Sequence, residues 1–355
     1  MSAMQTALTT RSVDTPSGRI SYAEAGAGPV ALFVHGVLLN KHLWRRQLSD
    51  LSDIRRCIAV DLLAHGDTEI APDQDVSVTA NAGMLREVLD VLKIDQVDLI
   101  GNDSGGGIAQ IFAALNLERV RTLTLTDCDT HDNWPPEPFK PFLDMAAAGG
   151  LRDTLNAMLS DKNIYRSPGA LGPAYERPEE VTDDDIEIYL RPFLRTEQRT
   201  RDFRRFLGAF DARHTPAIEP QLRRLEAPTL LVWGTDDVYF PVKWAYWRRL
   251  RSPEPGRRSN CRARGCFSLR SVRRSSTGRC TLTCRRLETF PLGPWPAPAR
   301  SRHPWLCNPV RGSLTGKSAT GAAVISVGYA ATDRAVAIRS MIAAASATGA
   351  SSWTL

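Results

Sequence analysis

The sequence predicts an α/β fold in which a mainly parallel sheet is flanked by helices. Apolar runs of strand length, at 30–34, 97–100 and 120–126, are separated by longer segments, and residues 78–92 among these show apolar residues at helical spacing. Strands that alternate with helices form parallel sheets with right-handed crossovers. The three strand-like runs and the helical stripe therefore define the fold class.

The remaining elements follow the same pattern along the chain. A hairpin is predicted at the start, because the alternating segments 12–15 and 20–25 flank a Pro-Ser-Gly turn. A short helix at 44–51 and a strand at 56–61 come next. The last strand of the pattern is 228–233, which ends in a Gly-Thr-Asp-Asp segment.

The most informative segment is the sharp corner that follows the run 97–100. It reads Gly-Asn-Asp-Ser-Gly-Gly, and such glycines let a strand and a helix approach closely, which thrusts the central residue out above the sheet. In the familiar G-x-S-x-G corner that residue is serine, whereas here it is Asp103 and Ser104 follows. The sequence therefore indicates displacement by a carboxylate. The alternative is that Asp103 only caps the next helix.

Three segments in this order resemble the α/β-hydrolase family over about residues 11–250: the strand ending in His-Gly-Val at 35–37, the Asp103 corner, and Gly-Thr-Asp-Asp at 234–237. The chain is most similar to the branch with an aspartate nucleophile, the haloalkane dehalogenases and soluble epoxide hydrolases. The resemblance implies an α/β-hydrolase fold with a helical cap. It also implies hydrolysis of a small apolar haloalkane or epoxide through an alkyl-enzyme ester, without cofactor or metal.

The resemblance assigns roles to individual residues. Asp103 is the nucleophile, Asp237 is the acid that orients a histidine, and the backbone N–H groups of Val37 and Ser104 form the oxyanion hole. Two alternatives are kept, a serine esterase or lipase-like hydrolase that uses Ser104 and an inactive or truncated homologue. The residues expected around the substrate pocket are His35, Gly36, Asn40, Trp44 and Asn102.

The histidine that should activate water has no matching position. The family places it after the eighth strand, where this sequence is rich in arginine, and His303 lies beyond that stretch without matching context. His131 is therefore considered either as an unusual base or as a polar loop residue. Asp127, Asp129 and Asp132 offer a second position for the acid.

The two enzyme types within this branch differ in the groups that assist the reaction. Haloalkane dehalogenases usually carry Trp after the nucleophile and Asn after the His-Gly pair, whereas this chain has Ser104 and Val37 there. Epoxide hydrolases use cap tyrosines as acids. Tyr165, Tyr175 and Tyr189 lie in the predicted cap, although such tyrosines are more often packing residues.

Charge divides the chain unevenly. The net charge is +6, but residues 1–250 carry −8 and residues 251–355 carry +14. Residues 1–132 and 223–250 are predicted to form the hydrolase core, and residues 133–222 the helical cap. The remaining residues are interpreted as an atypical Arg/Cys/Pro-rich and then Ala-rich tail, out of frame or disordered.

The composition of the tail is typical of GC-rich DNA read out of frame. Residues 257–286 hold ten arginines, four of the seven cysteines and no lysine or acidic residue. Codons can be chosen for 259–286 that encode a strand, an acidic turn and an amphipathic helix when read in another frame. We therefore hypothesise a frameshift near residue 251, which would remove the last strand and helix of the fold. A nucleic-acid-binding tail, a zinc site and disulfides are the alternatives, but the C-x₄-C and C-x₃-C spacings with no nearby histidine do not suit zinc.

Location and partners follow from what the sequence lacks. No apolar run reaches the roughly 18 residues of a membrane span, and the first ten residues do not form a signal peptide. No Gly-Lys-Ser/Thr follows the glycines at 105–107, so they do not form a phosphate loop. We expect a cytoplasmic protein with a small-molecule substrate and with no nucleic acid or membrane partner.

Overall fold

The computed structural model describes most of the first 250 residues and four short strands of the tail. The Arg/Cys/Pro-rich and Ala-rich tail that begins at residue 251 lies outside these residues, apart from those strands. The described residues are 9–249, 267–274, 280–286, 313–314 and 322–327.

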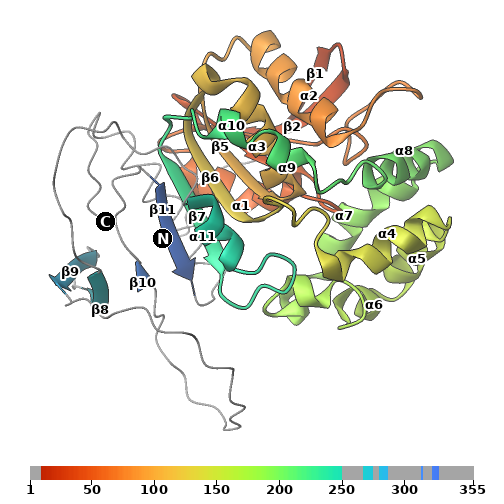
Figure 1. Cartoon of the computed structure of the whole chain (residues 1–355). Coiled ribbons are helices and arrows are strands. Elements are labelled where there is room, and N and C mark those ends of the chain that lie inside the picture. Colours follow the sequence, from red (N-terminus) through yellow and green to blue (C-terminus); the bar gives the residue numbers. More distant parts are fainter. Residues whose placement is uncertain (1–8, 250–266, 275–279, 287–312, 315–321, 328–355) are drawn as a thin grey trace, which may run out of the picture.

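A nine-stranded sheet forms the centre of the molecule (Figure 1). Its strands are β1 (Thr9–Thr15), β2 (Gly18–Ala25), β3 (Val30–Val34), β4 (Arg56–Val60), β5 (Val97–Asp103), β6 (Val120–Cys128), β7 (Thr229–Gly234), β10 (Ser313–Leu314) and β11 (Ala322–Val327). The strand order is β1-β2-β4-β3-β5-β6-β7-β11-β10, and all neighbours from β4 to β11 are parallel. Antiparallel pairing joins β1 to β2, β2 to β4 and β10 to β11. The predicted mainly parallel sheet is confirmed.

The central strands are apolar throughout because both faces of the sheet are covered. In β3, successive side chains point to opposite faces. Leu32 and Val34 enter the larger core cluster, whereas Ala31 and Phe33 enter a smaller one with Trp44. All five residues of β3 are buried.

Helices cover both faces of the sheet. They are α1 (Arg45–Leu51), α2 (Val78–Val91), α3 (Ser104–Leu115), α9 (His214–Ala217), α10 (Glu219–Leu222) and α11 (Lys243–Arg249). The first, α1, packs on β2 and β4, whereas α3 packs on β5 and β6 with α2, α9 and α10 beside it. No helix of the described residues is long and apolar enough to cross a membrane.

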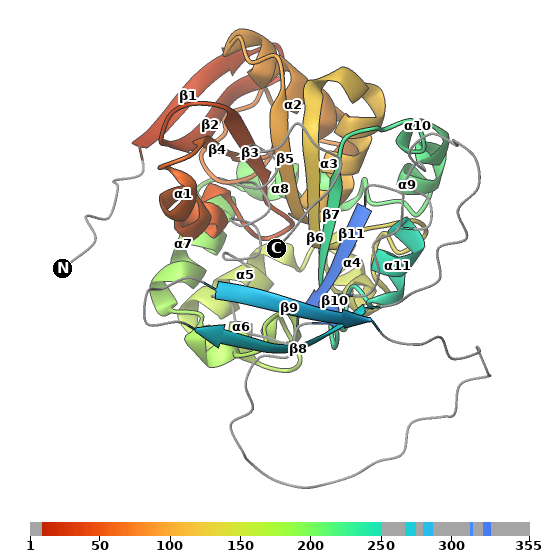
Figure 2. The same ribbon diagram turned by 90° about the vertical axis from the view of Figure 1, so that its left-hand side faces the viewer.

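A second group of helices lies between β6 and β7 in the chain. They are α4 (Lys140–Ala147), α5 (Leu151–Ser160), α6 (Lys162–Arg166), α7 (Asp183–Leu194) and α8 (Glu197–Leu207). These helices pack mainly on one another, and Figure 2 shows α5, α6 and α7 gathered below the strands. They occupy part of the segment predicted as a cap.

One expectation about the tail is not met. A chain that leaves its frame near residue 251 was expected to lack the last strand of the sheet, yet β11 lies parallel to β7. Ala322 is opposite Thr229 and Val327 is opposite Gly234. The apolar run 322–327 suits this position, because the edge of β7 offers unpaired backbone groups. The remaining described tail strands, β8 (Phe267–Arg274) and β9 (Cys280–Arg286), pair only with each other in a separate sheet.

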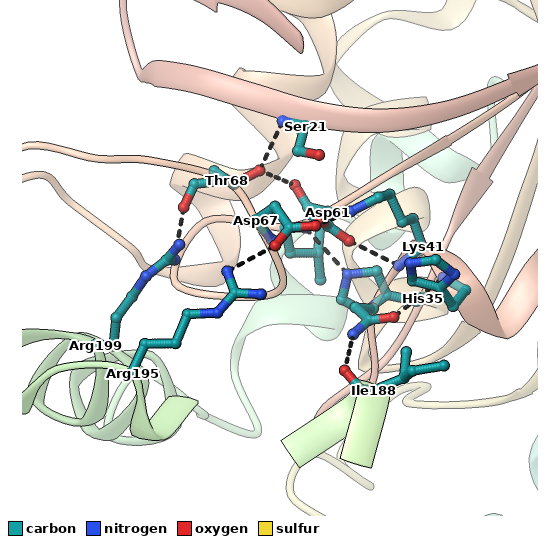
Figure 3. Close-up of polar contacts among 12 residues, drawn as sticks. Ser21, His35, Lys41, Asp61, Asp67, Thr68, Ile188, Arg195 and Arg199 are labelled. Atoms are coloured by element: carbon teal, nitrogen blue, oxygen red, sulfur yellow. Dashed lines mark hydrogen bonds and ion pairs between the residues drawn. The ribbon is translucent and has the colours of Figure 1, made fainter. Parts of the chain in front are cut away.

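A buried ion-pair network ties the core to helices α7 and α8 (Figure 3). Lys41 Nζ lies 2.7 Å from a carboxylate oxygen of Asp61 and 2.6 Å from one of Asp67. The second oxygen of Asp67 lies 2.7 Å from the Arg195 guanidinium, at the end of α7. Arg199 in α8 donates a hydrogen bond to the carbonyl oxygen of Thr68, the residue after Asp67, at 2.6 Å. The side chains of Lys41 and Asp61 are no more than 1% exposed.

We expect Lys41→Met to destabilise the protein strongly, because it leaves the Asp61 charge buried without its cation. Removing one partner of a buried pair costs about 3–5 kcal/mol. Urea unfolding followed by circular dichroism measures the loss. Arg191→Met is the control, because its pair with Glu187 is largely exposed and such pairs contribute roughly 0–1 kcal/mol. An equal decrease in the free energy of unfolding in the two variants would contradict a major contribution of the buried network to stability.

Candidate active site

The corner between β5 and α3 places Asp103 in a strained backbone conformation. Its φ is 57° and its ψ is −135°. Glycines make the corner possible: a Cβ on Gly101 would lie 2.7 Å from the Cα of Gly106, and one on Gly105 would lie 2.1 Å from the His35 carbonyl oxygen. Since real side chains do not approach so closely, the glycines are required for this packing.

A cavity of about 190 Å³ opens above Asp103. The Asp103 side chain lines it, whereas Ser104 is fully buried and does not. The Ser104 hydroxyl has no hydrogen-bond partner among the described residues. The lining residues are Val37, Leu38, Leu39, Leu43, Asn102, Asp103, Asp127, Asp129, Pro136, Phe139, Tyr165, Leu171, Ala174, Tyr175, Phe210, Asp237, Tyr239 and Phe240.

Backbone N–H groups hold the Asp103 carboxylate. The N–H of Ser104 donates to Asp103 Oδ1, and the N–H of Val37 also hydrogen-bonds to the carboxylate. Gly36 allows the approach, because a Cβ there would lie 2.4 Å from the Asp103 Cβ. The two donors predicted for the oxyanion hole therefore surround the nucleophile predicted from the sequence.

Burial raises the pKa of Asp103 to about 7. The Ser104 N–H opposes this rise, the negative charge of Asp237 adds to it, and the Val37 N–H opposes it again. A carboxyl with this pKa carries its charge fully only above neutral pH.

Three further aspartates line the cavity. Asp237 Oδ1 accepts hydrogen bonds from the N–H groups of Tyr239 and Phe240, both at 2.8 Å, which fixes the turn after β7. Asp127 Oδ1 accepts from the Gly234 N–H at 2.7 Å. No lysine or arginine belongs to the described part of the lining.

The third of these aspartates, Asp129, differs from the others in its surroundings. It is 1% exposed, and neither carboxylate oxygen has a hydrogen-bond partner in the part of the chain that the structure describes. Burial raises the pKa of Asp129 well above its usual range, and the charge of Asp103 adds to the rise. The predicted alternative acid is thus a carboxyl that favours its protonated form.

Two of the three candidate tyrosines face the cavity as a pair. The hydroxyl oxygens of Tyr165 and Tyr175 are 2.8 Å apart, and both residues belong to the lining. Burial raises the pKa of both hydroxyls, so they remain hydrogen-bond donors at neutral pH. Tyr189 is not part of the lining and accepts a hydrogen bond from Arg45 at 3.2 Å.

The structure does not bring His131 into the cavity. Its ring stacks on Trp247 with 4.2 Å between centroids, and His131 is not a lining residue. His35 is also outside, and both of its ring nitrogens are engaged: Nε2 accepts from the Leu62 N–H at 3.1 Å, and Nδ1 donates to the Gly36 carbonyl at 2.8 Å. Burial lowers the pKa of His35 to about 3. No histidine of the described residues lines the cavity.

Of the other predicted pocket residues, only Asn102 faces the cavity. Gly36 lies beneath Asp103 and is not itself a lining residue. The amide of Asn40 donates to the Ile188 carbonyl at 2.7 Å, and Trp44 packs on a core ring of β3. These two positions follow the His-Gly pair in sequence, but their side chains turn toward α7 and the core.

Several lining residues had no sequence signal. Phe139, Phe210 and Tyr239 lie far apart in the chain. A pattern of apolar residues does not separate aromatic rings of a pocket from those of a core. Among the described residues, no group of three or more His, Cys, Asp or Glu has the arrangement of a metal site.

Comparison with known proteins identifies the family. The family model described as "alpha/beta hydrolase fold" matches residues 29–157 of this chain. The chain is 39% identical over 246 residues to an uncharacterised protein of Mycobacterium tuberculosis, covering 66% of this chain and 69% of that protein. It therefore belongs to the alpha/beta hydrolase fold family.

More distant relatives include enzymes of the two predicted types. A haloalkane dehalogenase of Mesorhizobium japonicum is 29% identical over 190 residues, which cover 51% of this chain and 58% of the enzyme. Epoxide hydrolase 2 of Siraitia grosvenorii is 40% identical over 114 residues, 31% of this chain and 36% of that protein. A solved alpha/beta hydrolase fold protein of Burkholderia ambifaria superposes with a TM-score of 0.60 at 24% identity, over 69% of this chain and 88% of that one.

We expect Asp237→Asn to lower the pKa of Asp103. The asparagine oxygen can still accept from Tyr239 and Phe240, so the turn is retained while the negative charge that raises the pKa is lost. Carboxyl-labelled NMR titration of Asp103 measures the change, and Asp236→Asn, at an exposed turn position, is the control. A titration of Asp103 that is unchanged in Asp237→Asn would show that the Asp237 charge does not contribute to the raised pKa.

Proposed function

We propose that this protein hydrolyses a small, largely apolar epoxide, with Asp103 as the nucleophile. The observation that carries the proposal is the corner itself: the Asp103 carboxyl faces the cavity, and the Ser104 hydroxyl is buried. A serine esterase mechanism needs an accessible hydroxyl at this point. The structure gives that alternative no support.

The geometry suits a two-step reaction. One carboxylate oxygen of Asp103 attacks an epoxide carbon, the carbon–oxygen bond of the ring breaks, and an alkyl-enzyme ester forms. Water then attacks the ester carbonyl, and the N–H groups of Val37 and Ser104 stabilise the negative oxygen that develops there. The product is a diol, and Asp103 is restored.

The tyrosine pair favours an epoxide over a haloalkane. Opening an epoxide leaves a negative oxygen, and the hydroxyls of Tyr165 and Tyr175 are donors that face the cavity. A departing halide is instead held by N–H donors such as indole, and the position after the nucleophile holds Ser104. Haloalkanes are therefore the second substrate class to test.

Turnover in ¹⁸O-labelled water tests the nucleophile. With styrene oxide as probe, repeated turnover should place the label in the Asp103 carboxyl, because water attacks the ester there, and peptide mass spectrometry detects it. Asp103→Asn should lose activity by at least about 10³-fold, the scale on which removal of a nucleophile acts. 1-Iodobutane is assayed in parallel for the haloalkane class.

Ser104→Ala is the matched control for the competing nucleophile. It keeps the backbone N–H that binds the carboxylate, so we expect turnover within about threefold of wild type, since only a hydroxyl without a hydrogen-bond partner among the described residues is lost. Loss of activity in Ser104→Ala with retention in Asp103→Asn would instead establish a serine hydrolase. No turnover of any probe by a folded wild type would support an inactive homologue.

We also propose that the chain leaves its ancestral reading frame near residue 251. The change from net −8 to net +14 at that point supports this, as does a Mycobacterium tuberculosis relative that matches only 66% of the chain. Replacing residues 251–355 with the alternative-frame sequence should raise soluble yield, measured after centrifugation of matched expression cultures. Equal yields, or clean genomic reads that show an intact downstream frame, would count against a frameshift.

The cytoplasmic location, the cap and the lack of a nucleic acid partner remain predictions from the sequence.

A further inference from the structure

The buried carboxyl of Asp129 has no part in forming the ester. Asp129 follows β6 and lines the same cavity as Asp103. Its N–H donates to the Asp103 carbonyl oxygen at 3.4 Å, and Gln110 Nε2 donates to the Asp129 carbonyl at 2.8 Å. These backbone contacts fix Asp129 next to the nucleophile.

The Asp129 carboxyl group can accept a hydrogen bond from a ligand or hold a proton. Both carboxylate oxygens are buried, and neither has a hydrogen-bond partner among the described residues. A buried charge without partners is unfavourable, so Asp129 holds a proton while Asp103 is ionised. Asp103, in contrast, has two N–H donors that stabilise its negative form.

The second step needs a base in this cavity. Among the described residues no histidine lines it, while Asp237 accepts two N–H groups and Asp127 accepts one. Both carboxylate oxygens of Asp129 lack a hydrogen bond from the described part of the chain. Their capacity to accept a hydrogen bond is therefore unused within the described residues.

We propose that Asp129 is the base that activates water for hydrolysis of the Asp103 ester, an inference that rests on the proposed function. Esterification removes the negative charge of Asp103, and with it the repulsion that favours the proton on Asp129. Asp129 can then release its proton to the alkoxide of the opened ring. The base thus becomes available at the stage that requires it.

The steps balance in protons and charge. Asp129 gives its proton to the alkoxide after ring opening, and as a carboxylate it then takes one proton from water. The resulting hydroxide adds to the ester carbonyl of Asp103, and the bond to the product oxygen breaks. The proton on the new carboxyl moves to that oxygen, which leaves a diol, ionised Asp103 and protonated Asp129. The site as a whole carries one negative charge at every stage, either on one of the two residues or on the bound alkoxide or hydroxide.

Rapid-quench intact mass spectrometry with styrene oxide tests the proposal on the full chain. In Asp129→Asn we expect ester formation within about fivefold of wild type and ester hydrolysis slower by at least about 10²-fold, the scale of general base catalysis. The protein heavier by one substrate should therefore accumulate, with the adduct on Asp103. Asp129→Ala should also trap the ester, and added formate should restore its hydrolysis, which a purely structural role would not permit. Formate rescue decides the question where Asp129→Asn does not fold.

Two controls separate the possible explanations. Asp236→Asn removes a carboxylate from an exposed turn position outside the described lining, and it should clear the ester as wild type does; equal trapping would show that lost negative charge, and not a base, is responsible. His303→Gln should clear the ester as wild type does, and trapping there would assign the base to His303. Ester that forms on Asp103 and clears at the wild-type rate in Asp129→Asn overturns this inference alone. A wild type that forms no ester on Asp103 overturns the proposed function as well.

Discussion

The close approach of β3, β5 and α3 at a single corner determines the rest of the site. Gly105 lies against the carbonyl of His35, and Gly36 lies against Asp103 itself, at separations that no side chain could occupy. This packing forces Asp103 into a left-handed conformation and brings two N–H groups onto its carboxylate. The position of Asp103, its two N–H donors and the floor of the cavity therefore depend on the same few glycines.

The four aspartates around that corner differ in the number of backbone N–H groups that donate to them. Asp237 and Asp127 are held by backbone N–H groups, Asp103 by two more, and Asp129 by none in the described part of the chain. Burial raises the pKa of both Asp103 and Asp129, but backbone N–H groups oppose the rise only at Asp103. Such differences in burial and in N–H donors allow carboxyl groups of one residue type to take different roles.

The strands, the corner and the position of Asp103 at its apex could be predicted from the sequence, because each depends on residues close together in the chain. Buried runs such as 30–34 and the glycine spacing around Asp103 are local signals. Asn40 and Trp44 were misplaced because sequence distance does not indicate which way a loop side chain turns. The isolation of Asp129 and the meeting of Tyr165 with Tyr175 depend on packing between distant segments, which no spacing reveals. The pairing of 322–327 with β7 could not be predicted, because one short apolar run does not indicate which strand it will pair with.

A cavity lined by four aspartates, with no lysine or arginine in its described wall, also selects among the small molecules of a cell. Phosphorylated and carboxylated metabolites would meet repulsion and lose hydration without compensation on entering. Uncharged lipophilic compounds would pay no such penalty. Anionic compounds would therefore compete only weakly for this cavity, without a dedicated gate.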